Sequence, residues 1–279
     1  MKHIQTRTIW KPIPVFWRLI GLAVFRAKAA FVTIPSCRWS GILYLDHPRC
    51  VSVNKDFQNT AMCGRYVSKI DADVERHFNL TKVPFDFSSY NVAPGRNVPV
   101  VRGAETGERE LVLMRWGLIP HWAKEERIGY KMINARAETV DTKPAFRQPF
   151  KRHRCLIPAN GFYEWRKTES GKVPYYIRLK DDSVMGFGGL WDIWTNPEGE
   201  RIESCTIITS AANAVIQPLH DRMPFIVSPE AYDVWLTANV DGASEVMGIS
   251  SSAQLEAYPV STRVNKPVND DPGCIERVA

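Results

Sequence analysis

Strand-like segments dominate the middle of this chain, and they follow one another without alternating helices. Runs rich in β-branched and aromatic residues, bounded by Gly, Pro, Asn or Asp, lie at residues 110–120, 154–165, 174–180, 184–194 and 204–210. Such runs are typical of β-strands, whereas a parallel sheet would need a helix between each pair of strands. The sequence therefore predicts an α+β fold: a single domain with a mainly antiparallel β-sheet or barrel-like core, flanked by short helices.

Two segments have the pattern of short helices. Residues 68–80 carry apolar side chains at helical spacing, and Ser68 or Asp71 could cap the first turn. Residues 228–236 begin with Ser-Pro-Glu, which is typical of a helix start with Pro at the first helical position. Residues 91–102 mix Pro and Gly with β-branched residues, which predicts a loop that leads into a strand.

The first 61 residues differ from the rest in charge. They contain nine Lys or Arg and two Asp, so the remainder of the chain has a net charge of −1 although the whole chain has +6. The apolar run at residues 15–25 is interrupted by Arg18 and is too short to span a bilayer. We interpret residues 1–61 as a non-globular leader, either translated sequence upstream of a functional start at Met62 or an organelle transit peptide.

The six cysteines lie at positions 37, 50, 63, 155, 205 and 274. They form no C-x-x-C pair and have no His at zinc-finger spacing, so we expect reduced thiols, no metal site and no cofactor. This pattern predicts a cytoplasmic protein without a membrane segment.

Four segments put reactive or polar residues into apolar surroundings: MCGRY (62–66), MINARAET (132–139), PANGFYEW (158–165) and PLHDRMP (218–224). Each has a structural explanation when taken alone. Asn134 could cap a turn, Glu164 could pair with an Arg on the sheet, and His220 could be a satisfied loop histidine. A free cysteine is also more often inert than reactive.

Taken together, these segments resemble the SOS response-associated peptidase family, which includes bacterial abasic-site processing proteins and a eukaryotic relative first described as a hydroxymethylcytosine binder. The motifs YNVAPG (90–95), RWGLIPHWA (115–123) and YPVSTRVN (258–265) extend the resemblance over about residues 62–270. The resemblance implies that residues 62–275 form a catalytic domain that acts in the DNA damage or SOS response. The 61-residue leader is the departure from the family pattern.

In that family the initiator Met is removed and the new N-terminal cysteine reacts, so the resemblance implies that Cys63 is the first residue of the active protein. An N-terminal cysteine offers an α-amine and a thiol, with ordinary pKa values near 8 and 8.5. Together they can convert the aldehyde of an abasic site into a thiazolidine, a covalent DNA–protein crosslink. The resemblance assigns proton transfer to Glu164, opening of the deoxyribose ring to His220, and hydrogen bonding of the cysteine or its product to Asn134.

The partner implied by the resemblance is single-stranded DNA that contains an abasic site, bound by a monomer that would join the nucleoid when on DNA. The expected phosphate contacts are Arg65, Arg136 and Arg222, and Pro94 with Trp165 would form an apolar wedge against a neighbouring base. Arg147, Lys151, Arg152 and Arg154 form a further basic run that could follow the backbone or could simply be solvated.

Two other functions remain open at this stage. Cys63 could be the nucleophile of a thiol peptidase, a hydrolase that cuts its own leader or another chain. Alternatively, the domain could read modified or single-stranded DNA without forming a covalent bond. An abasic oligonucleotide and a denaturing gel separate a covalent trap from such a reader.

Overall fold

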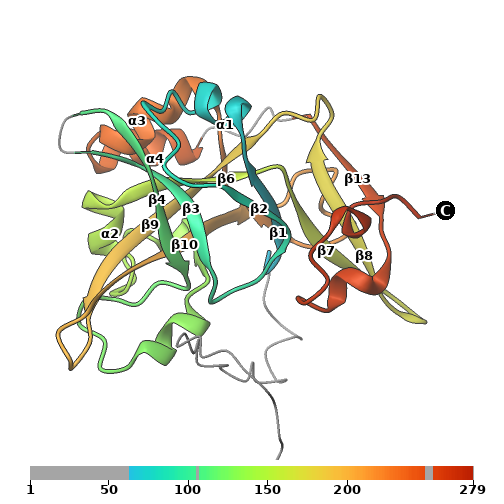
Figure 1. Cartoon of the computed structure of the whole chain (residues 1–279), viewed down its shortest axis with the longest axis horizontal. Coiled ribbons are helices and arrows are strands. Elements are labelled where there is room, and N and C mark those ends of the chain that lie inside the picture. Colours follow the sequence, from blue (N-terminus) through green and yellow to red (C-terminus); the bar gives the residue numbers. More distant parts are fainter. Residues whose placement is uncertain (1–62, 105–106, 249–253, 279) are drawn as a thin grey trace, which may run out of the picture. The chain divides into compact units, whose positions relative to one another are not determined.

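The computed structural model describes residues 63–104, 107–248 and 254–278. Residues 1–62 lie outside these ranges, and so does the predicted leader. Two β-sheets form the framework of the described chain (Figure 1). None of the helices in the described ranges combines the length and the apolar character needed to cross a lipid bilayer.

The first sheet is antiparallel throughout. Its strands are β1 (Tyr66–Ile70), β2 (Phe87–Val92), β7 (Gly161–Thr168), β8 (Gly171–Leu179) and β13 (Leu255–Pro259), in the spatial order β13-β8-β7-β1-β2. β1 therefore lies between β7 and β2, so the start of the described chain is fixed from both sides.

The second sheet closes on itself as a small barrel. Its ring contains β3 (Asn97–Gly103), β4 (Arg109–Trp116), β6 (Arg154–Ala159), β9 (Met185–Thr195) and β10 (Arg201–Ala211), joined in the order β10-β4-β3-β6-β9 and closed by the β9–β10 pairing. The β4–β10 contact is parallel and the other four are antiparallel. The short strands β5 (Asn134–Arg136), β11 (Arg222–Pro224) and β12 (Ile226–Val227) extend β10 and β9.

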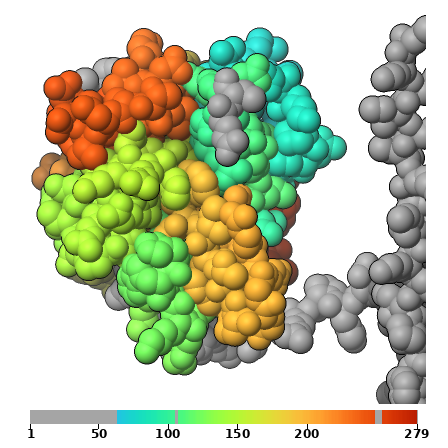
Figure 2. All heavy atoms as spheres, turned by 90° about the vertical axis from the view of Figure 1, so that its left-hand side faces the viewer, coloured from blue at the N-terminus to red at the C-terminus, as the bar shows by residue number. Residues whose placement is uncertain are grey.

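Short helices complete the fold. The α-helices are α1 (Ala72–His77), α2 (Arg147–Arg152), α3 (Tyr232–Thr237) and α4 (Val240–Gly248), and the 3₁₀ turns are η2 (Glu126–Lys131), η3 (Ala137–Thr139), η4 (Pro229–Ala231), η5 (Thr262–Asn265) and η6 (Pro272–Cys274). Figure 2 shows α3 and α4, in orange, on the same face as the yellow-green segment that includes α2. The expected α+β fold, with a mainly antiparallel, barrel-like core and short helices, is confirmed.

The apolar core has three parts because each sheet buries both faces. Side chains inside the barrel join one face of the antiparallel sheet, where the Tyr66 ring meets Trp116 and Phe187 edge to face at centroid distances of 5.2 and 6.1 Å. The outer face of the barrel packs against α1, α3 and α4. The remaining face of the antiparallel sheet is covered by the C-terminal segment, drawn in red in Figure 1.

Glycines in β9 allow α3 and the residue between β11 and β12 to pack closely against the barrel. A Cβ atom on Gly186 would lie 2.6 Å from the Tyr232 hydroxyl group, and one on Gly188 would lie 2.5 Å from the Phe225 ring. The sequence MGFGGLW thus combines the apolar pattern of a buried strand with the small residues that close packing requires.

Several element boundaries differ from the sequence-based expectation. The helix expected over residues 68–80 covers Ala72–His77, because Asp71 caps it by accepting the N–H groups of Asp73 and Val74 at 3.0 and 3.1 Å, while residues 66–70 pair as β1. The run at residues 154–165 is two strands, β6 and β7, divided at Asn160.

The helical segment expected at residues 228–236 begins as predicted, with Ser228 at the N-cap position and Pro229 in the first turn, but its first part is the 3₁₀ turn η4 and Ser228 makes no side-chain cap. One further local expectation was wrong. Arg154, which we expected in a surface patch, is buried and donates to the carbonyl groups of Phe150, Trp235 and Ala238.

Candidate functional site

The pairing of β1 with β7 brings Cys63 to Glu164. Tyr66 lies opposite Phe162, and the N–H of Tyr163 donates to the carbonyl oxygen of Arg65 at 3.0 Å. Two residues further along, the backbone N–H of Cys63 donates to Oε1 of Glu164 at 2.8 Å. Both side chains are buried, each with 3% exposure. The candidate nucleophile and the candidate acid/base are therefore in direct contact.

Burial makes this pair reluctant to ionise. Desolvation raises the pKa of the Glu164 carboxyl group, and the hydrogen bond from the Cys63 thiol and the charge of His220 act in the opposite direction. Desolvation also raises the pKa of the Cys63 thiol, which the charge of Glu164 and the hydrogen bond to it raise further. The thiol is thus protonated at neutral pH and is hydrogen-bonded to the Glu164 carboxyl group.

His220 lies in the connection between β10 and β11, close enough for its charge to lower the pKa of Glu164. Its Nδ1 accepts the N–H of Arg222 at 3.0 Å, which leaves the proton of a neutral ring on Nε2. The exposed carboxylate of Asp221 lies 2.9 Å from the same Nδ1 and would instead accept from a protonated ring. The two contacts give His220 a partner in either protonation state.

Asn134 and Arg136 are aligned by the strand next to them. β5 runs parallel to β10, with Asn134 opposite Ile207 and Arg136 opposite Thr209. Asn134 is partly buried and Arg136 is exposed. Within the described residues Arg136 takes part in no ion pair, so its guanidinium group is available to a ligand.

Arg222 is already engaged. From β11 its guanidinium group reaches both carboxylate oxygens of Glu138, at 2.5 and 2.8 Å, and the carbonyl oxygen of Thr209. The hydrogen bond from Arg222 lowers the pKa of Glu138, and the positive charge of Arg222 offsets a small part of the rise that burial causes in the pKa of Cys63. Arg222 thus acts on the electrostatics of the site while it is paired with Glu138.

Arg65, Pro94 and Trp165 lie on three separate parts of the chain: just before β1, in the turn after β2, and in β7. Arg65 donates to Oδ1 of Asn91 and to the carbonyl oxygen of Val264, both at 2.9 Å. The indole N–H of Trp165, the residue after Glu164, donates to Oδ1 of Asn265 at 2.7 Å. Pro94 begins the turn between β2 and β3, where the N–H of Gly95 donates to the carbonyl oxygen of Trp116 at 2.8 Å.

Sequence reasoning missed four polar residues of the site. Glu138 and Asp221 stand inside the motifs NARAET and HDRMP, so the motifs themselves contain the charged neighbours of Arg222 and His220. Asn91 lies in YNVAPG and is fully buried. Asp270 belongs to none of the quoted motifs, and no local signal identifies it.

A family model described as SOS response associated peptidase (SRAP) matches residues 62–267, which include every candidate site residue named above except Asp270. The chain belongs to the SOS response-associated peptidase family. Among its relatives in this family, the abasic site processing protein YoqW of Bacillus subtilis is 42% identical over 224 residues, which cover 77% of this chain and 99% of YoqW. The abasic site processing protein HMCES of Xenopus tropicalis is 34% identical and covers 68% of this chain and 66% of that protein.

Solved structures agree with this membership of the SOS response-associated peptidase family. A crystal structure of a protein from Bacteroides thetaiotaomicron superimposes with a TM-score of 0.62 at 29% sequence identity, covering 68% of this chain and 85% of that one. A protein from Bordetella bronchiseptica gives the same TM-score at 28% identity, with coverage of 71% and 100%.

Proposed function

We propose that this chain, with Cys63 as its first residue, traps abasic sites in single-stranded DNA as a covalent thiazolidine. One observation carries the proposal: the backbone nitrogen of Cys63, which becomes the α-amine, lies 2.8 Å from the buried carboxyl group of Glu164. The names of the curated relatives, which are abasic site processing proteins, support the same substrate.

The first step joins the α-amine to the sugar aldehyde. Glu164 accepts a proton from the ammonium group, and the freed lone pair forms an N–C bond while a second proton moves from the nitrogen to the carbonyl oxygen, which becomes a hydroxyl group. Glu164 then returns its proton to that hydroxyl group, the C–O bond breaks, and the departing water leaves a protonated imine. A carboxyl group whose pKa is raised by burial suits both directions of transfer at neutral pH.

The second step closes the ring. The Cys63 sulfur adds to the carbon of the protonated imine, the C=N electron pair returns to the nitrogen, and the thiol proton passes to Glu164, to which the thiol is hydrogen-bonded. Because both nucleophiles belong to one residue, ring closure is intramolecular and competes well with hydrolysis of the imine. The overall reaction releases one water molecule.

His220 would supply the proton transfers that open the closed sugar and expose its aldehyde, and its two alternative Nδ1 partners suit a group that changes protonation state. Asn134 would hydrogen-bond the cysteine or the product. Arg136 would bind a phosphate beside the lesion. Arg65 and Arg222 would add positive charge there while they keep their protein partners, and Pro94 with Trp165 would stack against a flanking base.

A thiol peptidase directed at the chain's own leader is the second candidate. The φ angle of Cys63 is 46°, a left-handed conformation that costs a residue other than glycine about 1–3 kcal/mol. The thiol would add to the carbonyl carbon of residue 62, the bond to the Cys63 nitrogen would break, and that nitrogen would take the thiol proton. Water would then hydrolyse the thioester and restore the thiol.

The test uses a chain that begins at Met62. After this Met has been removed, the protein is incubated with a single-stranded oligonucleotide that contains one abasic site. We expect an adduct that survives heating on a denaturing gel, with a mass one water below the sum of its parts. Cys63→Ala and Cys63→Ser keep the amine but lack the thiol, so they should give adducts only when borohydride is present. A band shift on a native gel without any covalent adduct would identify a non-covalent reader and reject the proposal.

A further inference from the structure

The segment Val264–Asp270, which we call the strap, is fastened to β2 by one buried amide. Asn91 is fully buried, and its Nδ2 lies 3.0, 3.1 and 2.7 Å from the carbonyl oxygens of Val264, Lys266 and Asn269. A side-chain amide that satisfies several carbonyl groups of one segment holds that segment in a single conformation.

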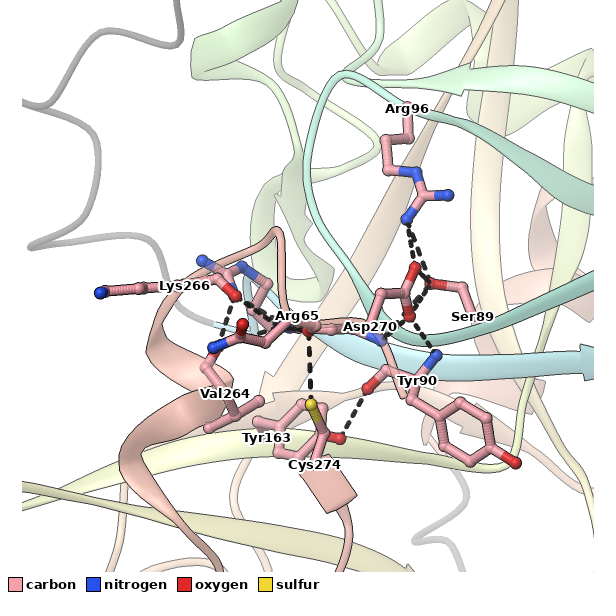
Figure 3. A network of polar contacts seen from close by, with 11 residues as sticks. Arg65, Ser89, Tyr90, Arg96, Tyr163, Val264, Lys266, Asp270 and Cys274 are labelled. Atoms are coloured by element: carbon pink, nitrogen blue, oxygen red, sulfur yellow. Dashed lines mark hydrogen bonds and ion pairs between the residues drawn. The ribbon is translucent and has the colours of Figure 1, made fainter. Parts of the chain in front are cut away.

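Asp270 anchors the other end of the strap (Figure 3). Its carboxylate accepts the N–H groups of Tyr90 and Asn91 at 2.6 and 2.9 Å, the hydroxyl group of Ser89 at 2.9 Å, and Nη1 of Arg96 at 2.9 Å. Partial burial opposes ionisation, but the hydrogen bonds from Arg96, Ser89 and Tyr90 bring the pKa of Asp270 below its ordinary value. The strap is therefore fixed by an ionised group at neutral pH.

The strap contacts the neighbours of both reacting residues. Arg65, two residues after Cys63, donates to the carbonyl oxygens of Val264 and Asn265 at 2.9 and 3.3 Å. Trp165, the residue after Glu164, donates to the side chain of Asn265. At its far end Asp270 binds Arg96, two residues after Pro94. The strap thus connects the three elements that carry Arg65, Pro94 and Trp165.

The outward side of the strap has a composition that folding does not require. Val268 is 83% exposed, the highest value among the large hydrophobic residues of the described chain. Lys266 is exposed, makes no ion pair within the described residues, and extends its side chain away from the network in Figure 3. An apolar side chain beside an unpaired cation, on a segment held this firmly, is suited to a single-stranded nucleotide, which has an apolar base and an anionic phosphate.

We infer that the strap is a further part of the DNA-binding surface, which takes a nucleotide next to the lesion. Lys266 pairs with its phosphate and Val268 covers its base or sugar, while Asp270 is a positioning residue that holds both in place. This inference rests on the proposed function, because it takes single-stranded DNA as the ligand.

The first experiment measures binding of an intact single-stranded oligonucleotide by fluorescence anisotropy at several salt concentrations. Lys266→Ala should weaken binding several-fold and lower the slope of log affinity against log salt by about 0.7, the value for one phosphate contact with a single strand. Val268→Ala should weaken binding with an unchanged slope. The matched controls are Lys82→Ala and Val234→Ala, which remove an exposed cation and a 44%-exposed valine from the α1–β2 connection and from α3.

The second experiment tests Asp270 through the kinetics of crosslinking. Asp270→Asn should raise the DNA concentration that gives half the maximal rate several-fold and leave the maximal rate unchanged, because Cys63 and Glu164 are not touched. Asp271→Asn is the control, since Asp271 pairs with Arg263 at 2.6 Å and caps η6 but contacts none of the three elements. A purely structural role would lower the melting temperature of both variants and would not separate the two kinetic parameters.

Parent-like binding by both Lys266→Ala and Val268→Ala would overturn the inference, whether or not Asp270→Asn folds. A fall in maximal rate alone for Asp270→Asn would reject its positioning role. Because the binding experiment uses DNA without a lesion, absence of a covalent adduct would count against the proposed function and leave the test of the strap intact.

Discussion

Two features of its surroundings act in opposite directions on the protonation of Glu164. Its carboxyl group is almost fully buried, which favours the neutral acid, yet it accepts hydrogen bonds from the backbone N–H and the thiol of Cys63, which favour the anion. The net effect is a raised pKa. A carboxyl group balanced in this way can take and return a proton within one reaction, as imine formation requires.

Glu164→Gln removes the proton-transferring group and keeps the shape of the side chain. We expect the rate of crosslinking to fall by about 10²-fold, the usual scale for loss of a general acid/base. The measurement is adduct formation against time on a denaturing gel, with single-strand binding as the control, which should not change. A parent-like rate across neutral pH would remove Glu164 from the mechanism.

The same variant also tests the pKa shift. Burial raises the pKa of Glu164 in the folded state. Between the unfolded pKa of about 4.3 and this higher folded pKa, the folded state binds more protons than the unfolded state, so the stability of the protein falls as the pH rises through this range. A Gln side chain does not ionise, so its burial does not cost the free energy of burying a charged carboxylate. Glu164→Gln should therefore melt at a higher temperature than the parent at pH 7. The difference should shrink on acidification towards about pH 4.

At the scale of elements, β10 aligns the two strands that carry the arginines proposed to bind phosphate. β5 and β11 both pair with it, and Thr209 lies opposite Arg136 on one side and Pro224 on the other. Each of these strands carries one arginine. Arg222, in β11, is paired with Glu138, whereas Arg136, in β5, is exposed. We therefore expect Arg136 to provide the larger share of phosphate binding.

Arg136→Ala should weaken single-strand binding and flatten its salt dependence by about 0.7 in log–log slope. Arg201→Ala is the matched control, since Arg201 is also exposed, stands at the start of β10 and makes no ion pair within the described residues. Equal salt slopes for Arg136→Ala and the parent would mean that Arg136 touches no phosphate.

Much of the fold could be predicted from the sequence because its strands have strong local signals. The β-branched and aromatic runs at 174–180, 184–194 and 204–210 correspond to β8, β9 and β10. The predicted ends of elements were wrong where tertiary contacts determine them. Residues 66–70 pair with β2 on one side and β7 on the other, so they form β1 instead of the first turn of the expected helix. Barrel closure by β9 and β10 depends on long-range register, which no local pattern contains.

The candidate site was predictable to the extent that its residues lie in motifs. Glu164 was noted as a polar residue in an apolar segment, and burial in that segment is what raises its pKa, while the family resemblance singled out Cys63 and His220. The strap could not be predicted, because Asp270 and Tyr90 are in contact although they are 180 positions apart in the sequence. No local pattern at either residue indicates this contact. The state of the arginines was also ambiguous, since the sequence alone does not reveal that Arg222 pairs with Glu138.

At the scale of the whole described chain, the antiparallel sheet and the barrel share one apolar core, and the start of β1 lies where they meet. Cys63 is buried there, with its backbone nitrogen directed at Glu164 rather than at solvent. While that nitrogen is part of a peptide bond it has no lone pair for attack on an aldehyde. The account therefore requires that the chain before Cys63 be removed before the reaction.

The most direct test compares two lengths of the same protein. One is the full 279-residue chain, verified as uncleaved by intact mass, and the other begins at Met62 and has lost that Met. Each is incubated with an abasic single strand and analysed on a denaturing gel. The account predicts a heat-stable adduct with the short form and none with the uncleaved chain. A heat-stable adduct formed equally well by the uncleaved chain would contradict the N-terminal cysteine mechanism.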